Sequence, residues 1–188
     1  MRPDIVAIGA PAGGVEGVTD LVGRLPENLS AAVLVVLHRS PFPHSYLPET
    51  LRRVAHLRVV VPIEGDPLET GACFVGPPDK LLTVGPGPRM RLLADGYYRG
   101  FTIDALFRSL AHSVGRRVIG VTLTGLLKDG WLGLKAIKEA GGTVVVEEPK
   151  ETNIPEIKSE IDFTGAVPAI ADFICERVRS GRGSPREL

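Results

Sequence analysis

The sequence predicts a doubly wound α/β fold, in which helices cover both faces of a mainly parallel sheet. Continuous apolar runs such as 32–37 have the pattern of strands buried on both faces. They alternate with amphipathic segments of helical length such as 15–24, and glycine or proline marks most boundaries. The 188 residues suit one domain with a sizeable core, since 44% are apolar and 23% are charged. An alternation of this kind is typical of a parallel sheet wrapped by helices.

The individual elements follow from the same two patterns. Uninterrupted apolar and β-branched runs predict parallel strands at 5–8, 32–37, 57–61, 118–123 and 143–146. Apolar residues spaced by three or four positions predict helices at 15–24, 45–54, 103–113, 131–140 and 170–178. We expect Thr102 to cap the helix that begins at residue 103, and Gly141-Gly142 to end the helix at 131–140.

Between residues 71 and 93 the pattern changes to short strands separated by prolines and glycines. These strands are predicted at 72–75, 81–84 and 90–93. An antiparallel insertion or a sheet edge accounts for them most simply. The predicted architecture therefore has a small antiparallel insertion beside the parallel sheet.

The composition argues against several classes of function. The 22 basic and 22 acidic residues balance to a formal net charge of +0, so we expect no nucleic-acid partner. No apolar run approaches the ~20 residues that span a bilayer, so we expect no membrane insertion. Cys73 and Cys175 lack metal-ligand spacing and are too few for a disulfide scaffold. We therefore expect a cytoplasmic protein with no metal and no cofactor.

The turn that follows the first strand is a candidate site. The residues Gly9-Ala10-Pro11-Ala12-Gly13-Gly14 lead from this strand into a helix. They lack both the spacing of a dinucleotide-binding loop and the Lys-Ser/Thr step of a P-loop. Backbone N–H groups at a helix N-terminus are unpaired and carry partial positive charge, so an anion or a developing oxyanion is stabilised there.

His38 and Asp129 are candidate catalytic residues. Each follows a predicted parallel strand, and the sites of such sheets lie at the carboxyl ends of the strands. An aspartate that accepts the Nδ1–H of a histidine fixes its tautomer and stabilises the imidazolium formed when the ring takes a proton from a nucleophile. Taken alone, His38 also suits a structural hydrogen bond, and Asp129 suits a cap for the helix that follows it.

Five blocks of sequence, in this order, resemble the catalytic domain of CheB, the chemotaxis receptor methylesterase, and especially the variant fused to methyltransferase domains. The blocks are Ile8-Gly9-Ala10-Pro11-Ala12-Gly13-Gly14, Val36-Leu37-His38 with Ser45-Tyr46-Leu47-Pro48-Glu49, Phe74-Val75-Gly76-Pro77-Pro78, Ile103-Asp104-Ala105-Leu106-Phe107, and Thr124-Gly125 with Asp129-Gly130 and 133–142. The resemblance covers nearly the whole chain. It implies hydrolysis of glutamyl methyl esters on a methylated chemoreceptor or a related signalling protein, by a Ser-His-Asp triad.

The resemblance also assigns residues. It places the triad histidine at His38, the aspartate at Asp129 and the serine at Pro11, with Ala12 and then Gly13 as backbone donors to the oxyanion. Because proline has no hydroxyl, we expect hydrolysis to be impaired or absent. The best-known members carry an N-terminal phosphoacceptor domain, and we expect no such receiver domain here. Residues 1–180 are predicted to form one methylesterase domain, and residues 181–188 a flexible tail.

Three functional hypotheses remain open at this point. An active esterase would need another nucleophile, for which Ser40, Ser45, Thr124 and a water activated by His38 are the candidates. A non-catalytic binding or scaffold module would keep the esterase fold without turnover. It is favoured by Pro11 and by the segment around Lys158, where the family commonly has a Met-Pro step. A binder of anions or nucleotides at the Gly13-Gly14 helix start has only generic support.

Overall fold

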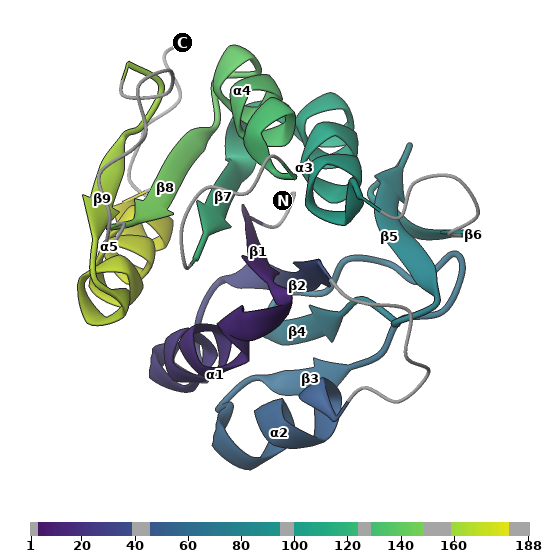
Figure 1. Cartoon of the computed structure of the whole chain (residues 1–188), viewed down its shortest axis with the longest axis horizontal. Helices are drawn as coiled ribbons and strands as arrows, with labels where there is room; N and C mark the ends of the chain where they lie inside the picture. The colour runs from purple at the N-terminus through teal and green to yellow at the C-terminus, as the bar shows by residue number, and fades with distance from the viewer. Residues whose placement is uncertain (1–3, 39–45, 95–99, 124–128, 149–158, 181–188) are drawn as a thin grey trace, which may run out of the picture.

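The computed structural model describes residues 4–38, 46–94, 100–123, 129–148 and 159–180, which form a seven-stranded sheet, a two-stranded hairpin and the helices around them (Figure 1). The seven strands are all parallel and lie in the order β3-β4-β2-β1-β7-β8-β9. Their bounds are β1 (Asp4–Pro11), β2 (Ala31–His38), β3 (Arg58–Val60), β4 (Ala72–Val75), β7 (Val118–Thr122), β8 (Thr143–Glu147) and β9 (Phe163–Gly165). The α-helices are α1 (Val15–Arg24), α2 (Leu47–Val54), α3 (Thr102–Ser113), α4 (Trp131–Glu139) and α5 (Val167–Ser180), with short 3₁₀ turns η1 (Ala12–Gly14) and η2 (Gly115–Arg117). The doubly wound α/β architecture is as predicted.

The central strand β1 feeds two hydrophobic cores, one on each face of the sheet. Ile5 and Ala7 lie in one core, whereas Val6 and Ile8 lie in the other, because successive side chains of a strand point to opposite faces. Figure 1 shows α1, α2 and α5 on one face, and α3 and α4 on the other. The continuous apolar run at the start of the sequence is therefore explained by burial on both faces.

The strands on the two sides of β1 come from different parts of the sequence: β2, β4 and β3 lie on one side, and β7, β8 and β9 on the other. The chain passes from β1 to β2 on one side, and much later returns as β7 on the other side. In a doubly wound sheet such a reversal leaves a crevice outside the carboxyl ends of the strands, where ligands bind. In this chain the carboxyl ends of β1, β2 and β7 meet at that edge of the sheet.

Helix α3 begins directly over β1. A Cβ atom added to Gly9 would lie 2.4 Å from Cγ2 of Ile103, so only glycine allows this approach. Ile103 is in the first turn of α3 and is fully buried. The N-terminus of α3 is thereby held beside the carboxyl end of β1.

Two strands differ from the sequence prediction. β4 lies inside the sheet, parallel to β3 and β2, so the assignment of 72–75 to an antiparallel insertion or a sheet edge was wrong. All four of its residues are buried, as in a strand covered on both faces. β9 is absent from the elements predicted from the residue pattern, since its three residues are too few to show a period.

The predicted antiparallel insertion is the hairpin of β5 (Lys80–Gly85) and β6 (Arg89–Ala94). Leu82 and Met90 bury their side chains in the core on the α3 side of the sheet. The amide of Val84 is bound by Ser109 of α3, with 2.9 Å between N and Oγ. The hairpin thus extends the cover over the α3 face.

Across the described ranges, no helix is both long and apolar enough to cross a bilayer.

Candidate active site

Pro11 and His38 lie side by side at the carboxyl ends of β1 and β2. They are register partners in this parallel pair, each at the last position of its strand. Partners in adjacent strands, about 4.8 Å apart, point their side chains to the same face of the sheet. The alternation along β1 and β2 makes this the face covered by α3 and α4. A side chain at position 11 therefore projects beside the imidazole of His38.

The imidazole of His38 contacts the carboxylate of Asp129. Nδ1 of His38 lies 3.0 Å from Oδ2 of Asp129, although the two residues are 91 positions apart. Since a carboxylate accepts hydrogen bonds and does not donate them, Nδ1 is the donor, which leaves Nε2 free to act on another group. The His38 side chain is 36% exposed and that of Asp129 only 2%, so a substrate can reach the imidazole while the carboxylate is shielded from water.

Asp129 is held by the first turn of α3. Its Oδ2 accepts the backbone N–H of Ile103 at 3.0 Å, and its Oδ1 accepts that of Asp104 at 2.9 Å. The N-terminal N–H groups of a helix lack partners within the helix and carry partial positive charge, so they stabilise a carboxylate placed on them. Two hydrogen bonds from backbone N–H groups thus fix the carboxylate of Asp129 in the position from which it contacts His38.

This arrangement overturns the expected cap at Thr102 and also the alternative in which Asp129 caps the helix that follows it. Thr102 is the first residue of α3 and makes no side-chain capping bond; the carboxylate of Asp129 supplies the cap from a distant part of the chain. Asp129 does not cap α4, the helix that follows it. The N-cap position of α4 is Gly130, whose φ of 106° belongs to the left-handed region that favours glycine. A tertiary contact outcompetes the local one in both cases.

Asp104 is a polar residue of the site that the sequence reasoning did not single out. It is 3% exposed, and its Oδ1 accepts the backbone N–H of Gly133 in α4 at 2.6 Å. Burial raises the pKa of the Asp104 carboxyl, and the nearby charge of Asp129 raises it further. The available signal was its spacing: Asp104 shares the buried stripe of α3 with Phe107 and Ala111, three and seven positions later.

The corner after β1 has an ordinary backbone. Pro11 has φ −66° and ψ 168°, an extended conformation that serine also adopts. Pro11 is the N-cap of η1 rather than a residue in the first helical turn, and Ala12 and Gly13 of η1 are exposed. Both residues therefore lie on the surface next to position 11.

Other candidates from the sequence are not placed. Ser40, Ser45, Thr124 and Lys158 lie outside the described residues, as does the tail at 181–188. Thr122, at the end of β7 and in register with Gly9, is buried, and its hydroxyl has no hydrogen-bond partner among the described residues. The site that the structure brings together thus consists of Pro11, His38, Asp129 and the start of α3.

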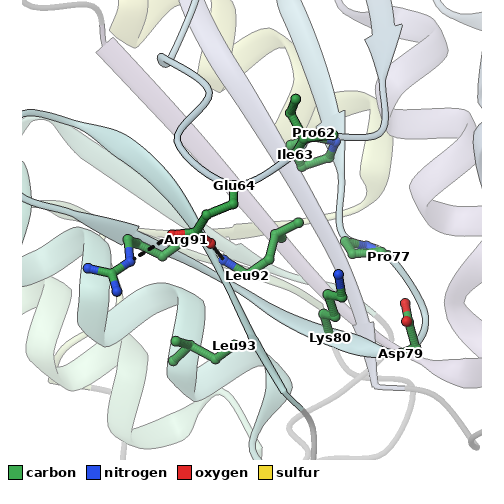
Figure 2. A pocket seen from close by; sticks show the side chains of 9 residues that line it. All are labelled: Pro62, Ile63, Glu64, Pro77, Asp79, Lys80, Arg91, Leu92 and Leu93. Carbon is green, nitrogen blue, oxygen red and sulfur yellow. Dashed lines mark hydrogen bonds and ion pairs between the residues drawn. The ribbon is translucent and has the colours of Figure 1, made fainter.

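A separate pocket of about 450 Å³ lies at the β5–β6 hairpin (Figure 2). Its described lining residues are Pro62, Ile63, Glu64, Pro77, Asp79, Lys80, Arg91, Leu92 and Leu93. Figure 2 shows the carboxylate of Glu64 joined to two of them: it pairs with Nε of Arg91 at 3.0 Å and accepts the N–H of Leu92 at 2.6 Å. Glu64 and Arg91 of this pocket are paired with each other, and Pro11, His38 and Asp129 are not among its described lining residues.

Comparison with known proteins identifies the family. Residues 6–173 match the family model described as CheB methylesterase. The chain belongs to the CheB methylesterase family. The crystal structure of the Thermotoga maritima CheB methylesterase catalytic domain superposes with a TM-score of 0.82 and 26% identity, over 94% of this chain and 100% of that one. The family and the fold inferred from the five sequence blocks are confirmed.

Curated relatives of the family carry a double name. The Methanosarcina mazei protein named protein-glutamate methylesterase/protein-glutamine glutaminase is 32% identical to this chain, over 94% of this chain and 52% of that protein. The relative with this name in Rhodospirillum rubrum is 33% identical, over 95% of this chain and 49% of that protein. The chain therefore spans about half the length of the curated relatives it matches.

Proposed function

We propose that this chain is a CheB-type protein-glutamate methylesterase domain that recognises glutamyl methyl esters on a chemoreceptor but hydrolyses them poorly. The observation that carries the proposal is the placement of Pro11 beside the His38–Asp129 pair. The fold presents a base and its orienting carboxylate to position 11, where a nucleophile would be needed, and that position has no hydroxyl. The relatives' names support the ester substrate.

Each residue of the site has a role in this proposal. His38 is the general base, with Nε2 as the proton acceptor, and Asp129 holds the imidazole in the Nδ1–H tautomer. The backbone N–H groups of Ala12, and then Gly13, are the donors for the oxyanion that forms when the ester carbonyl is attacked. No cofactor is needed for ester hydrolysis by such a group.

The absent hydroxyl removes the covalent route. A serine at position 11 would pass its proton to His38 while its oxygen attacks the ester carbonyl, and His38 would return the proton to the departing methanol. Water would then hydrolyse the glutamyl enzyme. Pro11 can form no such bond, so among the described residues of the site only slow attack by water assisted by His38 remains.

We place the chain in the cytoplasm, acting on the receptor's methylated glutamates. Cys73 and Cys175 are free thiols, which persist in a reducing compartment. The similarity to catalytic domains favours a domain that engages the ester itself over a scaffold that has lost this site. A module that binds the receptor without recognising the ester is an outcome that the experiment below would reveal.

The experiment restores the missing group. Pro11→Ser is incubated with a methylated chemoreceptor cytoplasmic domain, and released methanol is measured. We expect Pro11→Ser to release methanol, and the double variant Pro11→Ser/His38→Gln to lose at least about 10²-fold of that rate. Pro11→Ala, which removes proline without adding a hydroxyl, is the matched control and should stay inactive. A folded Pro11→Ser that binds the receptor but releases no methanol would overturn the proposal.

A further inference from the structure

The carboxylate of Asp104 is buried at a cost that its own surroundings do not explain. Its Oδ2 is buried and has no hydrogen-bond partner among the described residues, whereas Oδ1 accepts the N–H of Gly133. The backbone N–H of Gly130, next to Asp129, also acts on the Asp104 carboxyl and lowers its pKa. A buried polar atom without a partner destabilises a fold, because it loses its bonds to water and gains none in return. An apolar residue on this stripe of α3 would avoid that cost, so the carboxylate needs another explanation.

Asp104 and Asp129 bind each other's helices. Asp129 immediately precedes the start of α4 and accepts N–H groups from the first turn of α3. Asp104 is in the first turn of α3 and accepts an N–H group from the first turn of α4. Each carboxylate therefore occupies the N-terminus of the helix attached to the other. The two contacts fix the N-termini of α3 and α4 relative to each other.

The packing at Gly133 shows how closely this contact is built. A Cβ atom on Gly133 would lie 2.5 Å from Cβ of Phe107 and 3.2 Å from Oδ1 of Asp104. Only glycine lets α4 approach α3 closely enough for its backbone N–H to reach Oδ1 at 2.6 Å. The short contact therefore depends on both residues.

We propose that Asp104 is a positioning residue: its side chain holds the start of α4 against α3, so that Asp129 is placed to accept the Nδ1–H of His38. The His38–Asp129 contact then depends on a carbonyl-type acceptor at position 104 that never touches His38. This assignment rests on the proposed function only where it treats the His38–Asp129 pair as part of an ester-hydrolysing site.

The test reads the His38 tautomer without substrate. Which ring nitrogen carries the proton depends on the hydrogen bond that it makes, and ¹⁵N NMR distinguishes the two forms of the neutral ring. His38→Gln identifies the signals of His38. Asp104→Asn keeps an oxygen for the N–H of Gly133 and should retain the Nδ1–H form. Asp104→Ala removes the acceptor and should lose the predominance of that form.

A matched control separates positioning from general destabilisation. Asp162 also accepts a backbone N–H through its carboxylate, that of Val144 of β8 at 2.8 Å. It pairs with Lys138 in the last turn of α4, at the opposite end of that helix from the site. Asp162→Ala should keep the Nδ1–H form of His38. Retention of that form in folded Asp104→Ala would overturn the proposal, and so would its loss in folded Asp104→Asn.

A second variant covers the case in which Asp104→Ala does not fold. Asp104→Leu keeps the branched shape and has no acceptor, and it should also lose the Nδ1–H form. If neither variant folds while Asp162→Ala does, Asp104 is a purely structural residue and the proposal fails. Because the tautomer is measured without ester, this test can fail while Pro11→Ser releases methanol, and it can succeed while Pro11→Ser is inactive.

Discussion

Pro11 and His38 are register partners at the carboxyl ends of two adjacent parallel strands. The residue without a hydroxyl thus stands beside an imidazole whose Nδ1 is bound by the buried carboxylate of Asp129. In the proposed function, His38 is the base and Asp129 its orienting carboxylate, in a triad that lacks its serine. The placement of Asp129 depends on several contacts between distant parts of the chain: two hydrogen bonds from α3 and one contact with His38.

Asp129 should contribute to stability as well as to the site. In Asp129→Asn the single amide oxygen replaces two carboxylate oxygens that accept from Ile103, Asp104 and His38. At least one backbone N–H then faces an NH₂ group and loses its acceptor. We expect the free energy of unfolding, measured in urea, to fall by about 1–3 kcal/mol. The exposed Asp172→Asn in α5 is the control and should change it by less than about 0.5 kcal/mol. An equal effect of the two substitutions would refute the capping role.

Gly133→Ala should destabilise the fold although alanine favours helices. Helix propensity alone would stabilise α4 by about 1 kcal/mol. The new Cβ would lie 2.5 Å from Cβ of Phe107, however, and a buried helix pair relieves such a clash only by moving apart. We expect a net loss of about 1–3 kcal/mol in urea unfolding. Gly100→Ala, where nothing lies within 4 Å of the added Cβ, should be neutral or slightly stabilising. A more stable Gly133→Ala would contradict the packing.

Much of the fold is legible in the sequence, and the exceptions have physical causes. The span of α1 was predicted to the residue, because its apolar stripe and the buried strands around it give strong periods. β4 was misassigned because the Gly76-Pro77-Pro78 segment that follows it resembles the turn of a hairpin. Its place in the sheet instead depends on pairing with β2, which is far away in the sequence. The expected cap at Thr102, and the alternative in which Asp129 caps α4, fail for the same reason. Capping rules consider only residues next to a helix in the sequence. The hydrogen bonds between Asp129 and α3 join residues that are 25 and 26 positions apart, so these rules could not predict them.

The site was only partly within reach of the sequence. The strand ends and the family blocks single out Pro11, His38 and Asp129, but no pattern shows that His38 and Asp129 touch. Asp104 was part of a quoted block without a role, because a lone aspartate on an apolar stripe gives no indication of its partner. Its partner, the N–H of Gly133, is a backbone group, which sequence does not reveal.

Asp104 should make the fold less stable as the pH rises. Burial raises its pKa in the folded state, with Asp129 adding to the increase, while the N–H groups of Gly133 and Gly130 and the charge of Arg108 act against it. Between the unfolded pKa of about 3.9 and the higher folded pKa, the folded chain binds more protons, so the free energy of unfolding falls with rising pH. The side chain of asparagine does not titrate in this range, so Asp104→Asn should not show this fall in the free energy of unfolding.

The measurement is urea unfolding of both proteins from about pH 4 to about pH 7, a range that begins near the unfolded pKa. The stability of Asp104→Asn relative to the unmodified chain should increase across this range, since contributions from other groups largely cancel in the difference. A difference that stays constant or declines would show that burial does not raise this pKa.

Cys73 should be chemically silent in the folded chain. Burial in β4 raises the pKa of its thiol to about 12, and the thiolate is the reactive form. In Cys175→Ser, which leaves Cys73 as the only thiol, labelling by a disulfide reagent near neutral pH should be more than about 10³-fold slower than in urea. Labelling of the folded chain at a rate close to that of the unfolded chain would contradict this placement of β4.

The central claim is that the site lacks only its nucleophile, and methanol release from a methylated chemoreceptor domain by the unmodified chain and by Pro11→Ser tests it most directly. The backbone at Pro11 is one that serine adopts, so the substitution should not disturb the corner. We predict that Pro11→Ser is faster by at least about 10³-fold, the scale on which triad members act. Comparable rates for the two proteins, with substantial turnover by the unmodified chain, would contradict the account and show that another group attacks the ester.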